Sequence, residues 1–164
     1  MTAEIIVRGD QLPVLVPLAV AQAAGSVLPT AMVWSVDLAA ESSRRSAQKR
    51  LRRICAELGD YAAAQPRLNH LFVVYTHGGA LREGTCLSTA GQAATRLHAT
   101  IERSRGRSLD VIALDVTGWE DGELLRDRII EAAETPAGTA AEIALGWHDI
   151  TQDSIRVAAA KQYY

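Results

Sequence analysis

The chain has 164 residues, of which 48% are hydrophobic and 22% are charged, and its net charge at neutral pH is -2. This balance predicts a single folded domain over residues 1–164 and excludes a disordered chain. The small negative charge gives no general attraction to nucleic acid or anionic lipid, so such binding would need a local patch.

The N-terminal part begins with AEIIVRG (3–9), an apolar run that predicts a first strand. The apolar stretch at 12–24 is too short, and too interrupted by Pro13 and Pro17, to cross a membrane. No basic segment precedes it as in a secretory signal, so we expect it to be buried. The prolines argue against both a central strand and a regular helix, which leaves the structure of residues 8–29 undecided.

Strands and a helix are predicted next. AMVWSVD (31–37) and HLFVVYT (70–76) are rich in β-branched and aromatic residues and read as strands. Between them, residues 41–64 predict a long helix that Ser42 or Ser43 can cap and Pro66 ends. Its apolar residues recur at spacings of three and four: Ala47, Leu51, Ile54, Cys55, Leu58 and Ala62.

The second half repeats this alternation. Ser88 can cap a helix that carries Ala90, Ala94, Leu97 and Ile101 on one face and ends at SRGR (104–107). LDVIALDV (109–116) predicts a fourth strand, and Gly118 leads into a helix with an acidic first turn. AEIALGW (141–147) predicts a fifth strand, followed by a short helix at 151–161 and an exposed tail.

Strands that alternate with helices predict an α/β fold, a three-layer sandwich whose mostly parallel sheet of about five strands lies between helices. The carboxyl ends of parallel strands share one edge, where open α/β proteins bind ligands. Polar residues follow four strands: Asp37, Thr76, His77, Asp115, Thr117, His148 and Asp149. Each could be a cap, a turn former or an exposed loop residue, but together they predict a binding or catalytic cleft. Gly78 and Gly79 either form a turn or let the backbone approach a ligand closely.

A strand ending in His77 and Gly78, then a helix, then a strand ending in Asp115, resembles the caspase-like cysteine peptidases, the clostripain family most of all. Residues 31–37 resemble an earlier strand of that family. The resemblance implies that His77 belongs to a histidine–cysteine dyad, beside backbone N–H groups that stabilise an oxyanion. The family's cysteine, two residues beyond the aspartate, corresponds to Thr117, whose hydroxyl has a far higher pKa than a thiol. The resemblance therefore implies a caspase-like domain that lacks its catalytic cysteine.

The two cysteines, Cys55 and Cys86, form no CxxC motif and no cluster with histidine, so neither a metal nor another cofactor is expected. Reduced thiols suit a cytoplasmic protein. Cys55 is expected in the core. Cys86 is expected in a polar loop, where it could be exposed and from which it does not simply replace the missing nucleophile. Phosphate-binding motifs of the GxxxxGK[ST] and GxGxxG kinds are absent.

Residues 44–53 form a basic run. Six of its ten residues are Lys or Arg, namely Arg44, Arg45, Lys49, Arg50, Arg52 and Arg53. On a helix, Arg45, Lys49 and Arg52 share a stripe that could bind an acidic partner or the phosphates of nucleic acid. A solvated face, or pairing with the acidic helix at 120–134, is the alternative. No aromatic residues are interleaved, which disfavours nucleic acid.

Three functions follow, and the first is favoured: a degenerate caspase-like domain that acts as a non-catalytic interaction or regulatory module with a protein partner. The second is an active hydrolase in which His77 is the base, Asp37 or Asp115 orients it, and Thr117 or water is the nucleophile. The third is a binding protein that uses the basic helix on an acidic or nucleic-acid partner. The apolar N-terminal segment and the Tyr163–Tyr164 tail could also pack against a second copy, giving a homo-oligomer, and no membrane partner is expected.

Overall fold

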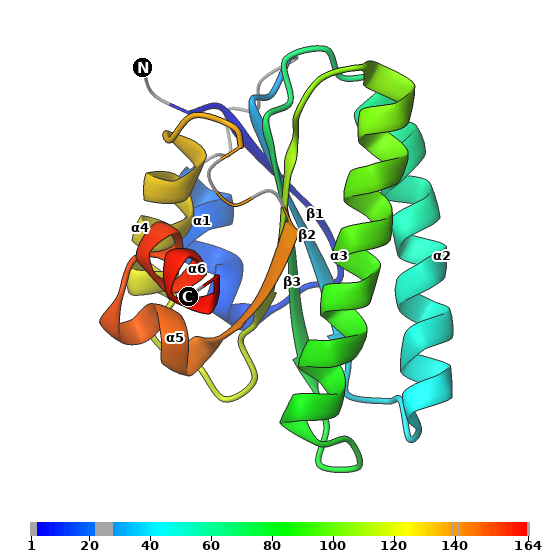
Figure 1. The fold of residues 1–164 in the computed structure, drawn as a ribbon. Coiled ribbons are helices and arrows are strands. Elements are labelled where there is room, and N and C mark those ends of the chain that lie inside the picture. The colour runs from blue at the N-terminus through cyan, green and yellow to red at the C-terminus, as the bar shows by residue number, and fades with distance from the viewer. Residues whose placement is uncertain (1–2, 22–27, 139, 141, 164) are drawn as a thin grey trace.

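The computed structural model describes residues 3–21, 28–138, 140 and 142–163. Five strands form one parallel sheet whose spatial order is the chain order. The strands are β1 (Ile5–Gly9), β2 (Ala31–Leu38), β3 (His70–His77), β4 (Asp110–Asp115) and β5 (Glu142–Gly146). Figure 1 shows the sheet between two layers of helices, which confirms the predicted α/β fold and three-layer sandwich.

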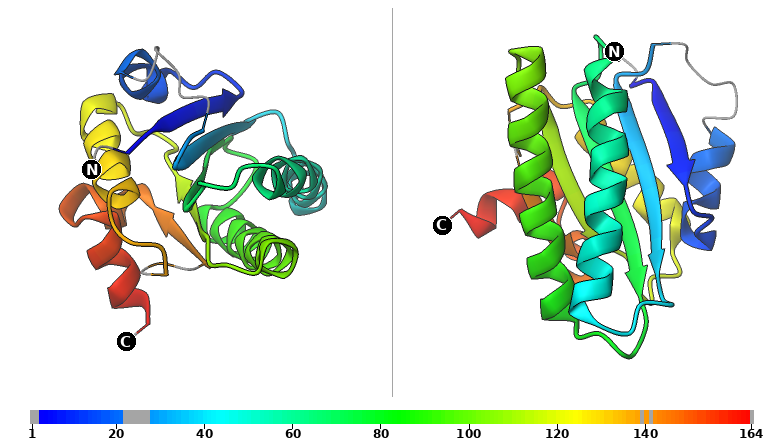
Figure 2. Two further views of the ribbon diagram at one scale, coloured as in Figure 1. Left: turned by 90° about the horizontal axis from the view of Figure 1, so that it is seen from above. Right: turned by 90° about the vertical axis from the view of Figure 1, so that its right-hand side faces the viewer.

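The helices are divided between the two faces of the sheet (Figure 2). One face carries α2 (Arg44–Ala63) and α3 (Glu83–Arg105), and the other carries η1 (Pro13–Leu15), α1 (Val16–Ala21), α4 (Gly122–Ala133), α5 (Trp147–Gln152) and α6 (Ile155–Gln162). Each face has its own apolar core, because side chains alternate across the strands. Tyr75 of β3 packs towards α2 and α3, whereas Phe72 of the same strand packs towards the other layer.

The connections between strands differ in direction. Because the strands lie in chain order and the helices cover both faces, the crossovers on one face have the opposite hand to those on the other. Parallel sheets usually have right-handed crossovers throughout, so this topology is rare. The chain leaves β3 towards the α3 face and leaves β4 towards the α4 face. The strand order does not reverse here, but the diverging connections resemble those of the switch points at which open α/β proteins bind ligands, and we call this place the switch point.

Helix α2 follows the sequence pattern closely, although it begins at Arg44 rather than Glu41. Of the two serines predicted to cap it, Ser43 does so: its side chain accepts from the backbone N–H of Ser46, and Ser46 completes a capping box. The predicted apolar residues are buried except for Cys55, which is only half-buried. The prediction of a core position for Cys55 is therefore only partly right.

Helix α3 begins at Glu83, five residues before the predicted cap Ser88. An acidic residue in the first turn stabilises the positive end of a helix, so this start is physically reasonable. Cys86 consequently lies inside α3 and is 5% exposed, and its prediction as a loop residue that could be exposed is wrong. The helix ends as predicted, because Gly106 adopts the left-handed conformation (φ 67°) that favours glycine after a last turn.

The two ends of the chain differ most from the predictions. Residues 147–162 form two short helices instead of one, because Ser154 caps a new helix by accepting from Val157 N–H. In the undecided segment at 8–29, Pro13 occupies the first position of η1, where a missing N–H is tolerated. Residues 22–27, Ala141 of the predicted fifth strand and Tyr164 of the tail lie outside the described residues.

No helix in the described ranges has both the length and the apolar character needed to span a bilayer.

Candidate functional site

His77 and Asp115 form the centre of the candidate site at the switch point. They stand at the ends of neighbouring parallel strands, in a register that places Tyr75 beside Asp115. The His77 Nε2 atom lies 3.1 Å from Asp115 Oδ2. The Asp115 side chain is 1% exposed and that of His77 10%, so the pair is almost completely removed from water. The structure thus brings together two of the residues that the sequence singled out.

Thr117 joins this pair through its hydroxyl and backbone. Its Oγ1 donates a hydrogen bond to Asp115 Oδ1 at 2.6 Å, and its backbone N–H donates to the same oxygen at 2.9 Å. The backbone N–H of His77 in turn donates to Thr117 Oγ1 at 2.9 Å. The hydroxyl therefore uses both its donor and an acceptor position to tie the two strand ends together.

The two ring nitrogens of His77 face different groups of the chain. Its Nδ1 atom is 3.2 Å from the carbonyl oxygen of Gly78. Its Nε2 atom lies 3.1 Å from Asp115 Oδ2, and no described hydrogen bond reaches that carboxylate oxygen. No described hydrogen bond joins the imidazole to the Thr117 hydroxyl. The Thr117 hydroxyl is thus directed towards Asp115 and not towards the imidazole.

Two further buried side chains, Tyr75 and Cys86, lie near Asp115. Tyr75 is fully buried, and its hydroxyl has no hydrogen bond within the described chain. Burial raises the pKa of Tyr75, and the neighbouring acidic groups of Asp115, Cys86 and Glu83 raise it further. Burial, followed by Asp115, also raises the pKa of the Cys86 thiol. Cys86 is thus close to the position at which the family resemblance places a nucleophile. Its thiol is nevertheless protonated at neutral pH.

Asp37 lies on β2 beside the site, but it does not hold the imidazole. Its Oδ1 atom accepts from the backbone N–H of Ala39 at 2.9 Å and from Thr76 Oγ1 at 3.3 Å. Its own N–H donates to Asp10, whose part in this edge was not predicted. Between the two carboxylates that were proposed to orient His77, it is Asp115 that faces the ring.

The glycines after β3 have different surroundings. A Cβ on Gly78 would lie 2.8 Å from the carbonyl oxygen of Ala39, so the close approach at this position is to the chain itself. A Cβ on Gly79 would meet nothing within 4 Å. The Gly78 backbone is thus packed against the chain, whereas Gly79 faces open space.

His148 and Asp149 belong to α5, beyond the end of β5. His148 is exposed, with its ring against Trp147 at a centroid distance of 3.5 Å. Asp149 accepts from the Gly146 N–H at 2.9 Å, which is the role of a residue that stabilises a helix start. Within the part of the chain that the structure describes, no hydrogen bond or ion pair joins either residue to His77 or Asp115.

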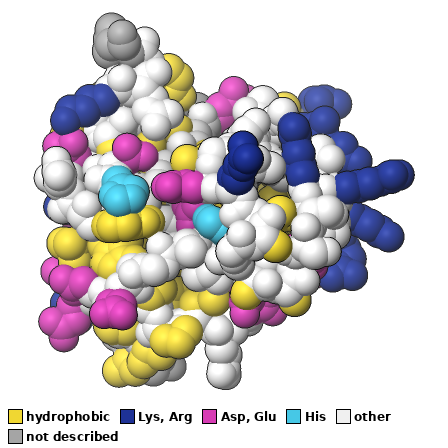
Figure 3. Space-filling model, turned by 90° about the horizontal axis from the view of Figure 1, so that it is seen from below, with side chains coloured by type: hydrophobic (Ala, Val, Ile, Leu, Met, Phe, Trp, Pro, Cys, Tyr) yellow, Lys and Arg dark blue, Asp and Glu magenta, His cyan; other side chains and the backbone are white. Residues whose placement is uncertain are grey.

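The basic run forms an exposed surface on α2. Figure 3 views the end of the molecule at which the strands finish, and Lys and Arg side chains gather along its α2 side. The exposed residues are Arg44, Arg45, Lys49, Arg52 and Arg53, none of which forms an ion pair with a described residue. Arg50 differs, because it contacts Asp10 at 2.6 Å and Glu41 at 3.9 Å. Asp10 is 40 positions away in the chain, so no local pattern indicates this pair.

No three His, Cys, Asp or Glu side chains among the described residues are placed to hold a metal ion together.

Comparison of the chain with known protein families, with curated proteins and with solved structures finds no match. The likeness to caspase-like peptidases is therefore supported only by the residues of this chain.

Proposed function

We propose that this protein is a degenerate caspase-like domain that acts as a non-catalytic interaction or regulatory module. The observation that carries the proposal is the state of Thr117, the residue at the position that resembles the nucleophile. Its hydroxyl donates to Asp115 and accepts from the His77 backbone, so it serves the structure of the strand ends. The two free cysteines suit a reducing compartment, and we place the protein in the cytoplasm.

An active hydrolase is less well supported by the same geometry. A general base must reach the proton it removes, directly or through one water. Here the Thr117 proton lies towards Asp115 Oδ1 at 2.6 Å, and both imidazole nitrogens of His77 face groups of the chain. Asp115 also holds the Thr117 backbone, which makes it a positioning group for the loop.

The proposal is tested by hydrolysis assays on peptide and ester substrates. We expect the wild-type protein, His77→Ala and Thr117→Val to give the same background rate, with folding of each variant verified by circular dichroism. A rate in the wild-type protein that is lost in His77→Ala would overturn the non-catalytic function and favour the hydrolase.

A second experiment tests the caspase-like relationship separately. Thr117→Cys places a thiol where the family resemblance puts one, and its alkylation rate is measured against pH with and without His77→Ala. The native thiols give a low background, because burial raises the pKa of Cys55 to about 11 and also raises that of Cys86. A new thiol that reacts faster than free cysteine, and only with His77 present, supports the relationship. Ordinary reactivity counts against it.

A further inference from the structure

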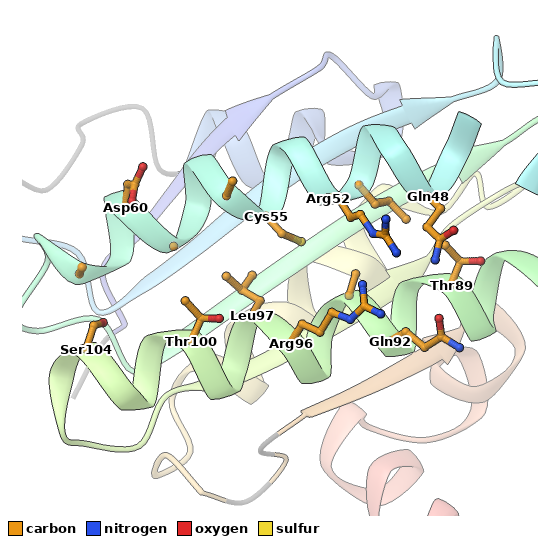
Figure 4. A pocket seen from close by; sticks show the side chains of 15 residues that line it. Gln48, Arg52, Cys55, Asp60, Thr89, Gln92, Arg96, Leu97, Thr100 and Ser104 are labelled. Atoms are coloured by element: carbon orange, nitrogen blue, oxygen red, sulfur yellow. The ribbon is translucent and has the colours of Figure 1, made fainter. Parts of the chain in front are cut away.

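A groove runs along the outer surface of the α2–α3 layer, away from the site at the strand ends. It has a volume of about 450 Å³, and the two helices supply its walls (Figure 4). Small and apolar side chains form much of its lining, namely Leu51, Cys55, Ala56, Gly59, Ala63, Ala93 and Leu97. A second hollow of about 390 Å³ is lined by Arg45, Gln48, Lys49 and Arg52. Gln48 and Arg52 line both, so the groove continues into the basic surface of α2.

Two arginines face each other across this groove. Figure 4 shows the side chain of Arg52 extending from α2 and that of Arg96 from α3 into the space between the helices. Both are exposed, and neither forms an ion pair or a hydrogen bond with any residue in the described ranges. Like charges that face each other repel, and an anion between them would remove that repulsion. Guanidinium groups also offer paired donors that match a carboxylate.

We propose that this groove binds an acidic amphipathic helix of a partner protein, an inference that rests on the proposed role as a non-catalytic interaction module. Carboxylates of the partner would pair with Arg52 and Arg96, and its apolar face would lie on the small side chains of the floor. A groove between two packed helices suits a third helix, which recognises it through side chains at positions i, i+3 or i+4, and i+7.

The floor of the groove favours a protein helix over nucleic acid. Binding of single strands relies on aromatic side chains on which bases stack, and the groove has none among its described lining residues. The net charge of -2 also gives the whole chain no general attraction to a polyanion. The groove itself carries two arginines, Arg52 and Arg96, and one carboxylate, Asp60, and it adjoins the basic face of α2.

The proposal is tested with synthetic peptides labelled with fluorescein. The probe is a helical peptide of about four turns, with leucines on one face and glutamates beside them. A second peptide has the same composition, scrambled so that the leucines share no face, and a labelled single-stranded oligonucleotide serves as the competing class of ligand. Fluorescence anisotropy with the full chain is measured at low and physiological salt.

We expect the amphipathic acidic peptide to bind more tightly than the scrambled one at both salt concentrations. The double substitution Arg52→Glu with Arg96→Glu should weaken its binding by about tenfold or more. Arg53→Glu is the matched control for Arg52→Glu alone, because both change one exposed arginine of α2 to glutamate and only Arg52 lines the groove. Arg52→Glu should therefore weaken binding more than Arg53→Glu does. Ala93→Leu fills the floor and should weaken binding with no change in charge.

Equal binding of the two peptides, or equal losses in Arg52→Glu and in Arg53→Glu, would overturn the proposal in favour of unspecific charge attraction. Absence of binding to the acidic peptide, or tighter binding of the oligonucleotide, would overturn it as well. Unfolding in urea verifies that each variant is folded. These outcomes are independent of the proposed lack of catalysis, which is measured at His77 and Thr117.

Discussion

The backbone N–H of His77 donates a hydrogen bond to the hydroxyl of Thr117 at 2.9 Å. This bond crosses from the last residue of β3 to the loop after β4, beyond the last paired residues of the two strands. The same hydroxyl donates to the buried carboxylate of Asp115 at 2.6 Å. One side chain thus holds the two strand ends at the switch point together, which gives Thr117 a structural role.

Thr117→Val should destabilise the protein, because it removes both hydrogen bonds while keeping the shape of the side chain. A hydrogen bond to a charged group contributes about 1.5–3 kcal/mol, and we expect a loss of this order in urea unfolding. Thr117→Ser keeps the hydroxyl and should lose much less. Equal stability of the valine and serine variants would show that the hydroxyl does not hold the strand ends.

The two glycines after β3 form a matched pair for a second prediction. Gly78→Ala would bring a Cβ within 2.8 Å of the Ala39 carbonyl oxygen, which requires the backbone to shift. We expect a loss of about 1–3 kcal/mol in the free energy of unfolding. Gly79→Ala meets open space and should be neutral, or stabilising by about 0.4–1 kcal/mol through the unfolded chain. Similar losses in both variants would contradict the close packing of Gly78 on Ala39.

The sheet and the position of the site were predictable from the sequence, because β3 and β4 are continuous apolar runs that end in polar residues. Parallel pairing of two such strands is enough to place His77 beside Asp115. The start of α3 was not predictable in the same way, since residues 83–87 include two polar residues, a glycine and no complete apolar period. The burial of Cys86 follows from that start.

Interactions between distant segments were also beyond the sequence. The basic run contains six similar residues, and only tertiary structure separates Arg50, paired with Asp10, from its exposed neighbours. Arg96 carries no local signal, and it becomes part of a groove because α3 packs beside α2. The sequence places Thr117 where the resemblance expects a cysteine, but it does not reveal the structural role of the hydroxyl, because the bond to the His77 backbone depends on the alignment of two strand ends.

A buried histidine at the opposite end of the sheet predicts acid sensitivity. His70 is 1% exposed, and its Nε2 lies 3.7 Å from the buried carboxylate of Asp110. Burial lowers the pKa of His70 from its ordinary value of 6.5, and Asp110 opposes part of this effect. Below that value the unfolded chain binds a proton that the folded protein does not, so stability falls as the pH decreases. The loss ends once the pH is below the lowered pKa.

His70→Gln removes this titration, and the free energy of unfolding should therefore fall less between neutral pH and about pH 5 than in the wild-type protein. Urea unfolding at the two pH values measures the difference. His148→Gln is the control, because it removes an exposed histidine from the same chain. An acid-induced loss that is as large in His70→Gln as in the wild-type protein would exclude His70 as its source.

Buried Tyr75 predicts a loss of stability at alkaline pH, as His70 does at acidic pH. Its buried hydroxyl has no hydrogen-bond partner among the described groups, so Tyr75→Phe removes an unsatisfied polar atom and should stabilise the protein by about 1 kcal/mol at neutral pH. Because the pKa of Tyr75 is raised, the unfolded chain loses the phenolic proton first as the pH rises above the ordinary value of 10, and stability falls. The phenylalanine variant should show a shallower decline in urea unfolding at about pH 10.5. Tyr61→Phe, which removes a partly exposed phenol, is the control, and a loss of stability in Tyr75→Phe at neutral pH would show that the hydroxyl has a partner.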